Sequence, residues 1–366
     1  MKVLMTADTV GGVWTYCMDL CRSLQLYNVE VHLVTMGAKM ESWQQQEVNA
    51  LENVVVYETD FVLEWMQNPW MDIEECGEWL LMLENDISPD LVHLNCFAYG
   101  CLPFKAPVLV VAHSDVFSWY LSVKRDDPPA EWNRYFWCVK NGLSKADTVV
   151  APSEAKLQLV SSIYNFSSYQ QVIYNGRSGH LFSPGEKQPL VFSMGRIWDE
   201  AKNIRLLAEA APYIKAPVRI AGETSFDTSC FQASAANLNF LGKISTGQVA
   251  AELASASVYV LPARYEPFGL SALEAALSGC ALVLGDIPTL REIWGDAAVY
   301  VDVHNRMELA EAVNSLIEDP ERLALMSSKA REKAKQYSAA AMARQYMQLY
   351  RQLVPLKTQT VKKEIA

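Results

Sequence analysis

Apolar and polar positions follow two alternating periods along the chain. Short apolar runs bounded by Gly, Pro, Asn or Asp predict buried strands, and the residues between many of these runs are apolar at helical spacing. The opening is typical: an apolar run over 3–7, a polar, glycine-containing loop over 8–12, and then Val13, Tyr16 and Leu20 on one helical face. Such an alternation predicts parallel α/β sheets.

The same rhythm occurs twice, with a turn-rich break between the two series. In the first half, strands are predicted at 3–7, 31–35, 54–57, 91–94, 108–112, 148–151 and 172–174, with helices at 72–85 and 153–164. Gly, Ser and Pro gather over 175–189, where we place a linker. The second series predicts strands at 190–194, 218–221, 238–241, 258–261 and 281–285, with helices that begin at Asn203, Ser245 and Gly269.

Two doubly wound, Rossmann-like domains follow from this repetition. With about 150 residues per domain as a guide, 366 residues also favour two domains. The predicted organisation is a first domain over 1–182, a second over 188–336, a final helix over 337–355 and a flexible tail over 356–366. Two similar α/β halves imply a cleft between them.

Composition fits a folded cytoplasmic protein. Hydrophobic residues make up 51% of the chain and charged residues 20%. No apolar run approaches the ~20 residues of a membrane helix, and the first residues lack the apolar core of a signal peptide. The eight cysteines form no Cys-x-x-Cys pair and have no histidine at zinc spacing, which favours reduced thiols over a metal site.

The net charge of −11 is unevenly distributed. Residues 1–186 hold 11 Lys and Arg against 23 Asp and Glu, whereas 187–366 hold 20 against 19. The first half is therefore a poor partner for nucleic acid or an anionic bilayer, and the second half is the better place for a phosphate ligand. One local cationic cluster allows at most weak peripheral contact with the inner face of a membrane: Lys124, Arg125, Lys140 and Lys145.

Candidate chemistry is concentrated in the segment 264–274, which directly follows a buried strand and opens a helix. Ligands of α/β sheets bind at the carboxyl ends of strands, and the free amides of a helix start favour an anion. Glu266 in the loop and Glu274 in the helix could accept hydrogen bonds from sugar hydroxyls. The alternative is a solvated loop carboxylate and a helix-surface carboxylate.

This Glu-x7-Glu segment, with its Pro-Phe-Gly loop, resembles the retaining glycosyltransferases of family 4. The resemblance covers the whole chain through Gly11-Gly12, the segment 90–93, His113, the segment 172–176, Gly195-Arg196 with Lys202, and a final helix with Tyr346 and Tyr350. It implies the glycosyltransferase-B fold, with the donor in the cleft and the last helix crossing back onto the first domain.

The resemblance also implies roles for single residues. Glu274 would hold the ribose diol and Glu266 the donor-sugar hydroxyls, while Arg196 and Lys202 would flank the diphosphate, whose charge grows as it leaves. The remaining donor contacts would come from main-chain groups near the base at Ile244 and from the amides of Phe268, Gly269, Leu270 and Ser271. One departure concerns Lys202, because the loop before it is longer than usual and Asn203 replaces a glycine.

In the first half, Gly11 and Gly12 would lie against the diphosphate and the acceptor, where close backbone approach is needed. His113 would contact the 6-hydroxyl or a phosphate of the donor; a core histidine is the alternative. His93 could line the acceptor side or be structural. Aromatic residues over 117–137, half of which we expect in the core, include candidates for stacking on a sugar acceptor.

The predicted function is a retaining glycosyltransferase that needs no cofactor or metal, since no Asp-x-Asp pair occurs in the sequence. It would move a hexose, first of all glucose from UDP-glucose, to a glycan or lipid-linked glycan in polysaccharide synthesis. Three alternatives remain open: a mannosyltransferase using GDP-mannose, a sugar-nucleotide epimerase, and a non-catalytic protein that binds nucleotide sugars.

Overall fold

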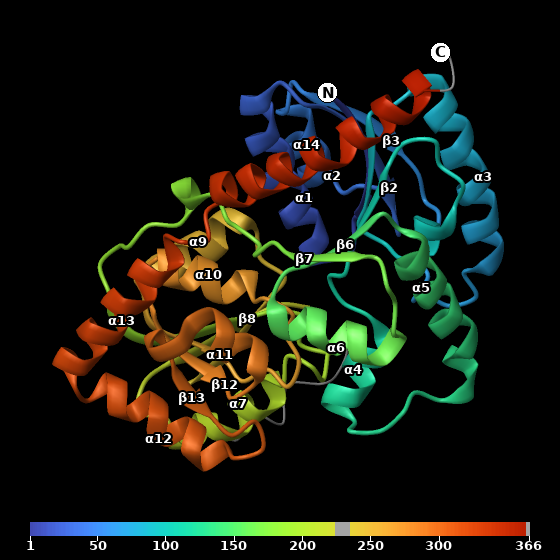
Figure 1. Cartoon of the computed structure of the whole chain (residues 1–366). Coiled ribbons are helices and arrows are strands. Elements are labelled where there is room, and N and C mark those ends of the chain that lie inside the picture. The colour runs from blue at the N-terminus through green and yellow to red at the C-terminus, as the bar shows by residue number, and fades with distance from the viewer. Residues whose placement is uncertain (224–234, 364–366) are drawn as a thin grey trace. The chain divides into compact units, whose positions relative to one another are not determined.

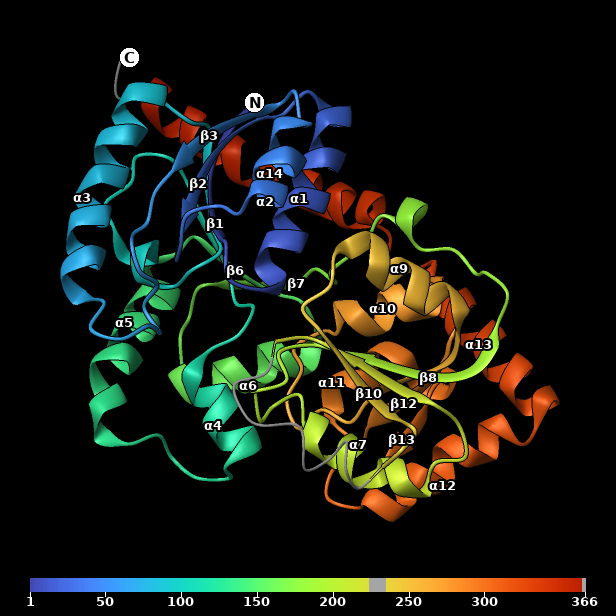
Figure 2. The same cartoon turned by 180° about the vertical axis from the view of Figure 1, so that it is seen from behind.

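Residues 1–223 and 235–363 are described by the computed structural model of the chain (Figures 1 and 2). They divide into two units. Unit 1 consists of Met1–Leu121, Asp126–Gly176 and the C-terminal segment from Ala339. Unit 2 consists of Ser122–Arg125 and Arg177–Ser338. The chain thus passes into the second unit directly after Gly176, within the turn-rich stretch 175–189.

Unit 1 is built on a parallel sheet in which the described strands follow the order β3-β2-β1-β4-β5-β6-β7. The order reverses direction between β1 and β4, and the carboxyl ends of strands at such a reversal are where open α/β sheets bind ligands. The strands are β1 (Lys2–Asp8), β2 (Glu30–Met36), β3 (Val54–Glu58), β4 (Leu91–Leu94), β5 (Val108–Val111), β6 (Thr148–Ala151) and β7 (Tyr169–Val172).

Helices cover both faces of this sheet, and each face has its own apolar core. One core joins the sheet to α1 (Gly12–Leu24) and to the final helix α14 (Ala339–Lys363), with α2 (Ser42–Asn49) nearby. The other lies under α3 (Trp70–Ile87), α5 (Asn133–Lys145) and α6 (Glu154–Tyr164), on the opposite face (Figure 2). The short helix α4 (Val116–Val123) follows β5.

Unit 2 repeats the plan with a parallel sheet of described strands in the order β10-β9-β8-β11-β12-β13. Here the reversal lies between β8 and β11. The strands are β8 (Gln188–Met194), β9 (Val218–Ala221), β10 (Leu238–Gly242), β11 (Ala256–Leu261), β12 (Ala281–Gly285) and β13 (Val299–Val301). The helices are α7 (Ile204–Ala210), α9 (Thr246–Ser255), α10 (Leu270–Leu277), α11 (Pro288–Trp294), α12 (Arg306–Ile317) and α13 (Pro320–Ala334).

The doubly wound character of both halves is confirmed, and the final helix packs on unit 1 as predicted. That helix is described through Lys363, beyond the end predicted at 355. Strand β7 begins three residues and ends two residues earlier than predicted, and the edge strand β13 was not predicted. Among the described residues, no helix combines the length and the apolar character that a membrane crossing requires.

Candidate functional site

The carboxyl edge of the unit 2 sheet gathers most of the predicted donor-binding residues. Strands β8 and β11 are neighbours at the point where strand order reverses. Arg196 follows β8, and Glu266 lies in the loop between β11 and α10. Crevices of this kind are where open α/β sheets bind ligands, so the fold brings together two segments about 70 residues apart.

Glu266 is buried and paired with a lysine from the neighbouring loop. The Nζ of Lys202 lies 2.6 Å from Glu266 Oε2, and the two side chains are 19% and 10% exposed. The backbone carbonyl of Glu266 accepts a 2.6 Å hydrogen bond from Thr289 Oγ1. The carboxylate is therefore buried and ion-paired, and it is not the solvated loop residue of the alternative interpretation.

The conformation of the loop before Lys202 explains how a loop longer than is usual in the family still places the lysine beside Glu266. The backbone amide of Lys202 donates to the carbonyl of Asp199 over 3.0 Å in a tight turn. Asn203 adopts the left-handed conformation, with φ of 55°, which asparagine tolerates better than most residues. Its side-chain amide donates to the carbonyls of Pro262 and Val303, at 2.9 and 2.8 Å. Asn203 thus takes the place of a glycine and anchors the loop beside the end of β11.

Helix α10 begins at this edge of the sheet. Gly269 precedes it with φ of 93°, a conformation that favours glycine, and no side chain caps the helix start. The Phe268 amide lies 3.5 Å from Glu266 Oε1. The amides of Leu270 and Ser271 belong to the first turn, where they lack intrahelical acceptors. An anion or a polar sugar group would be favoured here.

Glu274 lies in the second turn of α10 and is also paired with a cation. Arg177 Nε donates to Glu274 Oε1 over 2.6 Å, and the two side chains are 7% and 11% exposed. Both residues belong to unit 2. Glu274, the residue predicted to bind the ribose, is thus a buried, ion-paired carboxylate. It is not the helix-surface glutamate of the alternative interpretation.

Arg196 has a different environment from the other predicted cation. Its guanidinium pairs with Asp199 at 2.9 Å and lies 5.4 Å from the ring of Trp198, while its side chain remains 43% exposed. Ile244 is half-buried and follows β10, the edge strand of the sheet. Arg196 is therefore accessible to a ligand, whereas Lys202 is held by Glu266.

In unit 1, the predicted glycines lie at the reversal of strand order. Gly11 follows β1 in a positive-φ conformation (128°), and Gly12 begins α1. Both are exposed, and a Cβ on Gly12 would meet no atom within 4 Å. This turn leaves room for a group to approach the backbone at the start of α1.

His113 follows β5 and has a defined proton position. Its Nε2 lies 2.8 Å from Asn95 Oδ1, and Asn95 Nδ2 donates to the carbonyl of Thr6 over 2.7 Å. Since the amide nitrogen must face that carbonyl, Asn95 Oδ1 is the atom that accepts from His113 Nε2, and the lone pair of the ring is on Nδ1. Burial first, and the charge of Lys156 second, lower the pKa of His113 to about 3. The neutral ring can accept a hydrogen bond from a hydroxyl at Nδ1.

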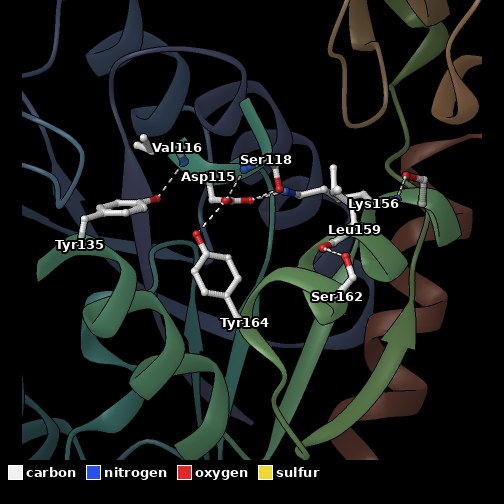
Figure 3. A network of polar contacts seen from close by, with 9 residues as sticks. Asp115, Val116, Ser118, Tyr135, Lys156, Leu159, Ser162 and Tyr164 are labelled. Carbon is white, nitrogen blue, oxygen red and sulfur yellow. Dashed lines mark hydrogen bonds and ion pairs between the residues drawn. The ribbon is translucent and has the colours of Figure 1, made fainter. Parts of the chain in front are cut away.

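A buried polar network holds the loop after His113 (Figure 3). Asp115 and Lys156 form a fully buried ion pair, with 2.5 Å between Oδ2 and Nζ. Asp115 also accepts from the backbone and hydroxyl of Ser118, at 2.8 and 2.5 Å, and from the hydroxyl of Tyr164 at 2.8 Å. The network joins the start of α4 to helix α6, so it fixes the segment that carries the histidine.

His93 lies in the core, whereas the aromatic segment is only partly there: Tyr135 is buried, and Phe117, Trp132 and Phe136 are partly buried against the same core. His93 is fully buried, with Nδ1 2.6 Å from the hydroxyl of Tyr350 and Nε2 3.3 Å from that of Tyr16. It therefore fastens the final helix and does not line an open surface. Within the aromatic segment, Phe117 packs against several rings of the same unit, whereas Trp137 is 57% exposed.

Asn95 and Arg177 were not among the predicted site residues. A signal for Asn95 was present, because it directly follows a strand predicted next to the one that leads to His113. Arg177 lies in the turn-rich stretch that we interpreted as a linker. Its pairing with Glu274, 97 residues away, has no signal in the sequence.

The predicted site residues thus form two groups at the carboxyl edges of the two sheets. Metal ligation is not indicated by clustering: within the described ranges, no group of three or more His, Cys, Asp or Glu residues is placed to hold an ion.

Comparison with known proteins identifies related families and folds. Residues 10–178 match the family model described as Glycosyltransferase Family 4, and residues 182–333 match Glycosyl transferases group 1. Alpha-maltose-1-phosphate synthase of Mycolicibacterium smegmatis is 27% identical over 320 residues, which are 75% of this chain and 82% of that protein.

Solved structures share the architecture at low sequence identity. Sucrose-phosphate synthase of Thermosynechococcus elongatus superposes with a TM-score of 0.82 at 18% identity, over 97% of this chain and 100% of that one. HepE of Anabaena, solved in complex with UDP and glucose, gives a TM-score of 0.76 at 16% identity, over 96% and 100% of the two chains. With both halves matched by glycosyltransferase models, the chain belongs to glycosyltransferase family 4, and it has the glycosyltransferase-B fold.

Proposed function

We propose that this glycosyltransferase moves a hexose from a nucleoside-diphosphate sugar, with UDP-glucose as the first choice, to a glycan or lipid-linked glycan, with retention of the anomeric configuration. The observation that carries the proposal is the pair of buried carboxylates around the start of α10, each held by a cation: Glu266 by Lys202 and Glu274 by Arg177. HepE, which shares the fold, binds UDP and glucose in its crystal structure, and this supports the choice of donor.

Each group at this edge has chemistry that suits one part of the donor. Ionised carboxylates only accept hydrogen bonds, so Glu274 suits the ribose diol and Glu266 the sugar hydroxyls. The start of α10 and the exposed guanidinium of Arg196 suit the diphosphate. In the reaction, these positive groups would stabilise the negative charge that the departing diphosphate gains.

Unit 1 would supply groups for the sugars. The exposed turn at Gly11 and Gly12 leaves the backbone open to an acceptor hydroxyl. Neutral His113 offers Nδ1 to a hydroxyl, which favours contact with the 6-hydroxyl over contact with a phosphate, because a phosphate needs a donor. The excess of acidic residues in the first half favours an acceptor that is neutral or weakly charged.

The test is calorimetric titration with UDP, GDP and ADP, followed by the glucose and mannose conjugates of the base that binds best. We expect UDP and UDP-glucose to bind, and transfer to a neutral oligosaccharide to follow. Preference for GDP and GDP-mannose would establish the mannosyltransferase alternative. Binding of none of the three diphosphates, by a chain shown to be folded, would contradict the proposal.

A further inference from the structure

Arg177 connects the predicted ribose ligand to a rigid part of unit 2. We propose that Arg177 is a positioning residue that holds the carboxylate of Glu274 in the orientation required to bind the ribose diol, and thereby sets the preference of the site for ribonucleotides. This inference rests on the proposed function, because it deepens the role given there to Glu274. Its basis is the buried contact of 2.6 Å between Arg177 Nε and Glu274 Oε1.

Arg177 is also held by contacts other than the one to Glu274. The backbone amide of Arg177 donates to the carbonyl of Tyr337 over 3.0 Å, and the residue forms a parallel bridge with Ser338. The Cζ atom lies 5.1 Å from the centre of the Phe182 ring, and Phe182 itself is only 3% exposed. Backbone pairing and ring stacking hold the arginine from two sides, so it acts as a fixed point to which the carboxylate is drawn.

The carboxylate needs such a fixed point more than an exposed glutamate would. Glu274 is 8% exposed on a helix whose other buried side chains are apolar. A carboxylate in such surroundings tends to take up a proton unless a cation pairs with it, and a protonated carboxyl group accepts hydrogen bonds less well. Arg177 supplies the charge, and its planar guanidinium restricts the direction of the carboxylate.

This arrangement gives the ligand a definite chemistry. A paired, ionised carboxylate offers only acceptor atoms, so its partner must donate, as the 2′- and 3′-hydroxyls of ribose do. A ligand without these hydroxyls would leave the buried carboxylate with fewer hydrogen bonds. A site of this kind therefore binds such a ligand much more weakly. Loss of Arg177 should therefore reduce the affinity that the ribose hydroxyls contribute more than the affinity that the base or the diphosphate contributes.

The test compares UDP with 2′,3′-dideoxy-UDP by calorimetry. We expect the wild-type chain to bind UDP at least tenfold tighter than the dideoxy form. In Arg177→Gln this ratio should fall below threefold, mainly because UDP binds more weakly, and Arg177→Lys should give an intermediate ratio because it keeps the charge without the planar geometry. Arg219→Gln is the matched control, since Arg219 is paired with Glu252 in the same unit and its variant should keep the wild-type ratio.

The outcomes separate this inference from the function on which it rests. An arginine with a merely structural role would lower both affinities equally, so a wild-type ratio in folded Arg177→Gln would overturn the inference. If that variant does not fold, the same ratio in Arg177→Lys decides. A wild-type chain that binds UDP without regard to the ribose hydroxyls, or binds no nucleoside diphosphate, would instead overturn the role of Glu274 in the proposed function.

Discussion

Lys202 Nζ lies 2.6 Å from Glu266 Oε2, although the two residues are 64 positions apart in the sequence. Each stands at the carboxyl edge of a different strand of one sheet, and the two side chains form an ion pair in a largely buried place. The pair therefore unites a group suited to the diphosphate with one suited to the sugar.

Glu266→Ala should separate binding from turnover. Because Glu266 is proposed to contact the transferred sugar and not the nucleotide, UDP affinity should stay within about threefold, while kcat falls by about a hundredfold or more. Calorimetry with UDP and initial rates of transfer measure the two effects. Loss of UDP binding with kcat unchanged would assign the residue to the nucleotide instead.

Glu274→Ala should show the opposite pattern. A hydrogen bond to a charged group is worth ~1.5–3 kcal/mol, so removal of the carboxylate should weaken UDP binding at least tenfold. Glu252→Ala, in the neighbouring helix α9, is the control and should bind UDP like the wild type. Equal affinity in both variants would contradict the ribose assignment.

Transfer should retain the anomeric configuration and should continue in the presence of EDTA. We expect retention from the family resemblance, and we expect chelator resistance because Arg196, Lys202 and the start of α10 carry the positive charge that the diphosphate needs. Proton NMR of the product and rates with and without chelator test both points. An inverted product, or activity that EDTA abolishes and manganese restores, would contradict this mechanism.

Two histidines with lowered pKa values, the buried His93 and the half-buried His113, should make the protein sensitive to acid. Burial, with a smaller contribution from the charge of His113, lowers the pKa of His93 to about 3, and His113 has a similarly low pKa. Both values lie below the ordinary 6.5, so the unfolded chain binds protons first, and stability is full above about pH 6.5 and falls as the pH drops toward 3.

Urea midpoints measured from about pH 7.5 to pH 4.5 test this sensitivity. His93→Gln should lose less stability over that range than the wild type, because one group that resists protonation is gone. His180→Gln is the control, since His180 is exposed. An equal acid-induced loss in wild type and His93→Gln would show that His93 is not the source.

Lys156→Met should destabilise the protein strongly. It leaves Asp115 as a buried charge without its cation, a change that costs about 3–5 kcal/mol in other proteins. Lys335→Met removes an exposed partner of Glu332 and should leave the urea midpoint unchanged. A wild-type midpoint for Lys156→Met would mean that the network in Figure 3 adapts without cost.

Much of the fold was predictable because the signals are local. Ser153 caps α6, Ser245 caps α9 and Gly269 precedes α10, each at the predicted residue, since cap chemistry depends on only a few neighbours. Buried strands such as β6 and β12 have the predicted bounds because their apolar runs are flanked by turn residues.

The pairing of side chains was not predictable in the same way. Asn95 reaches His113 only because β4 and β5 are neighbours, and Arg177 reaches Glu274 across 97 residues of chain. Strand β13 is only three residues long, too short to give a clear period. Such features depend on the assembled sheet, whereas the Glu-x7-Glu spacing is visible in one segment.

The placement of α14 in unit 1 has a consequence for folding during synthesis on the ribosome. Tyr350 and His93, joined by a 2.6 Å hydrogen bond, are separated by 257 residues, so the ribosome has made all of Arg177–Ser338 before the core beside α1 can close. Unit 2 can therefore complete its core first, although unit 1 begins the chain. Until α14 has been synthesised, the apolar face of α1 that packs against it stays uncovered. A chaperone would be needed most at this face.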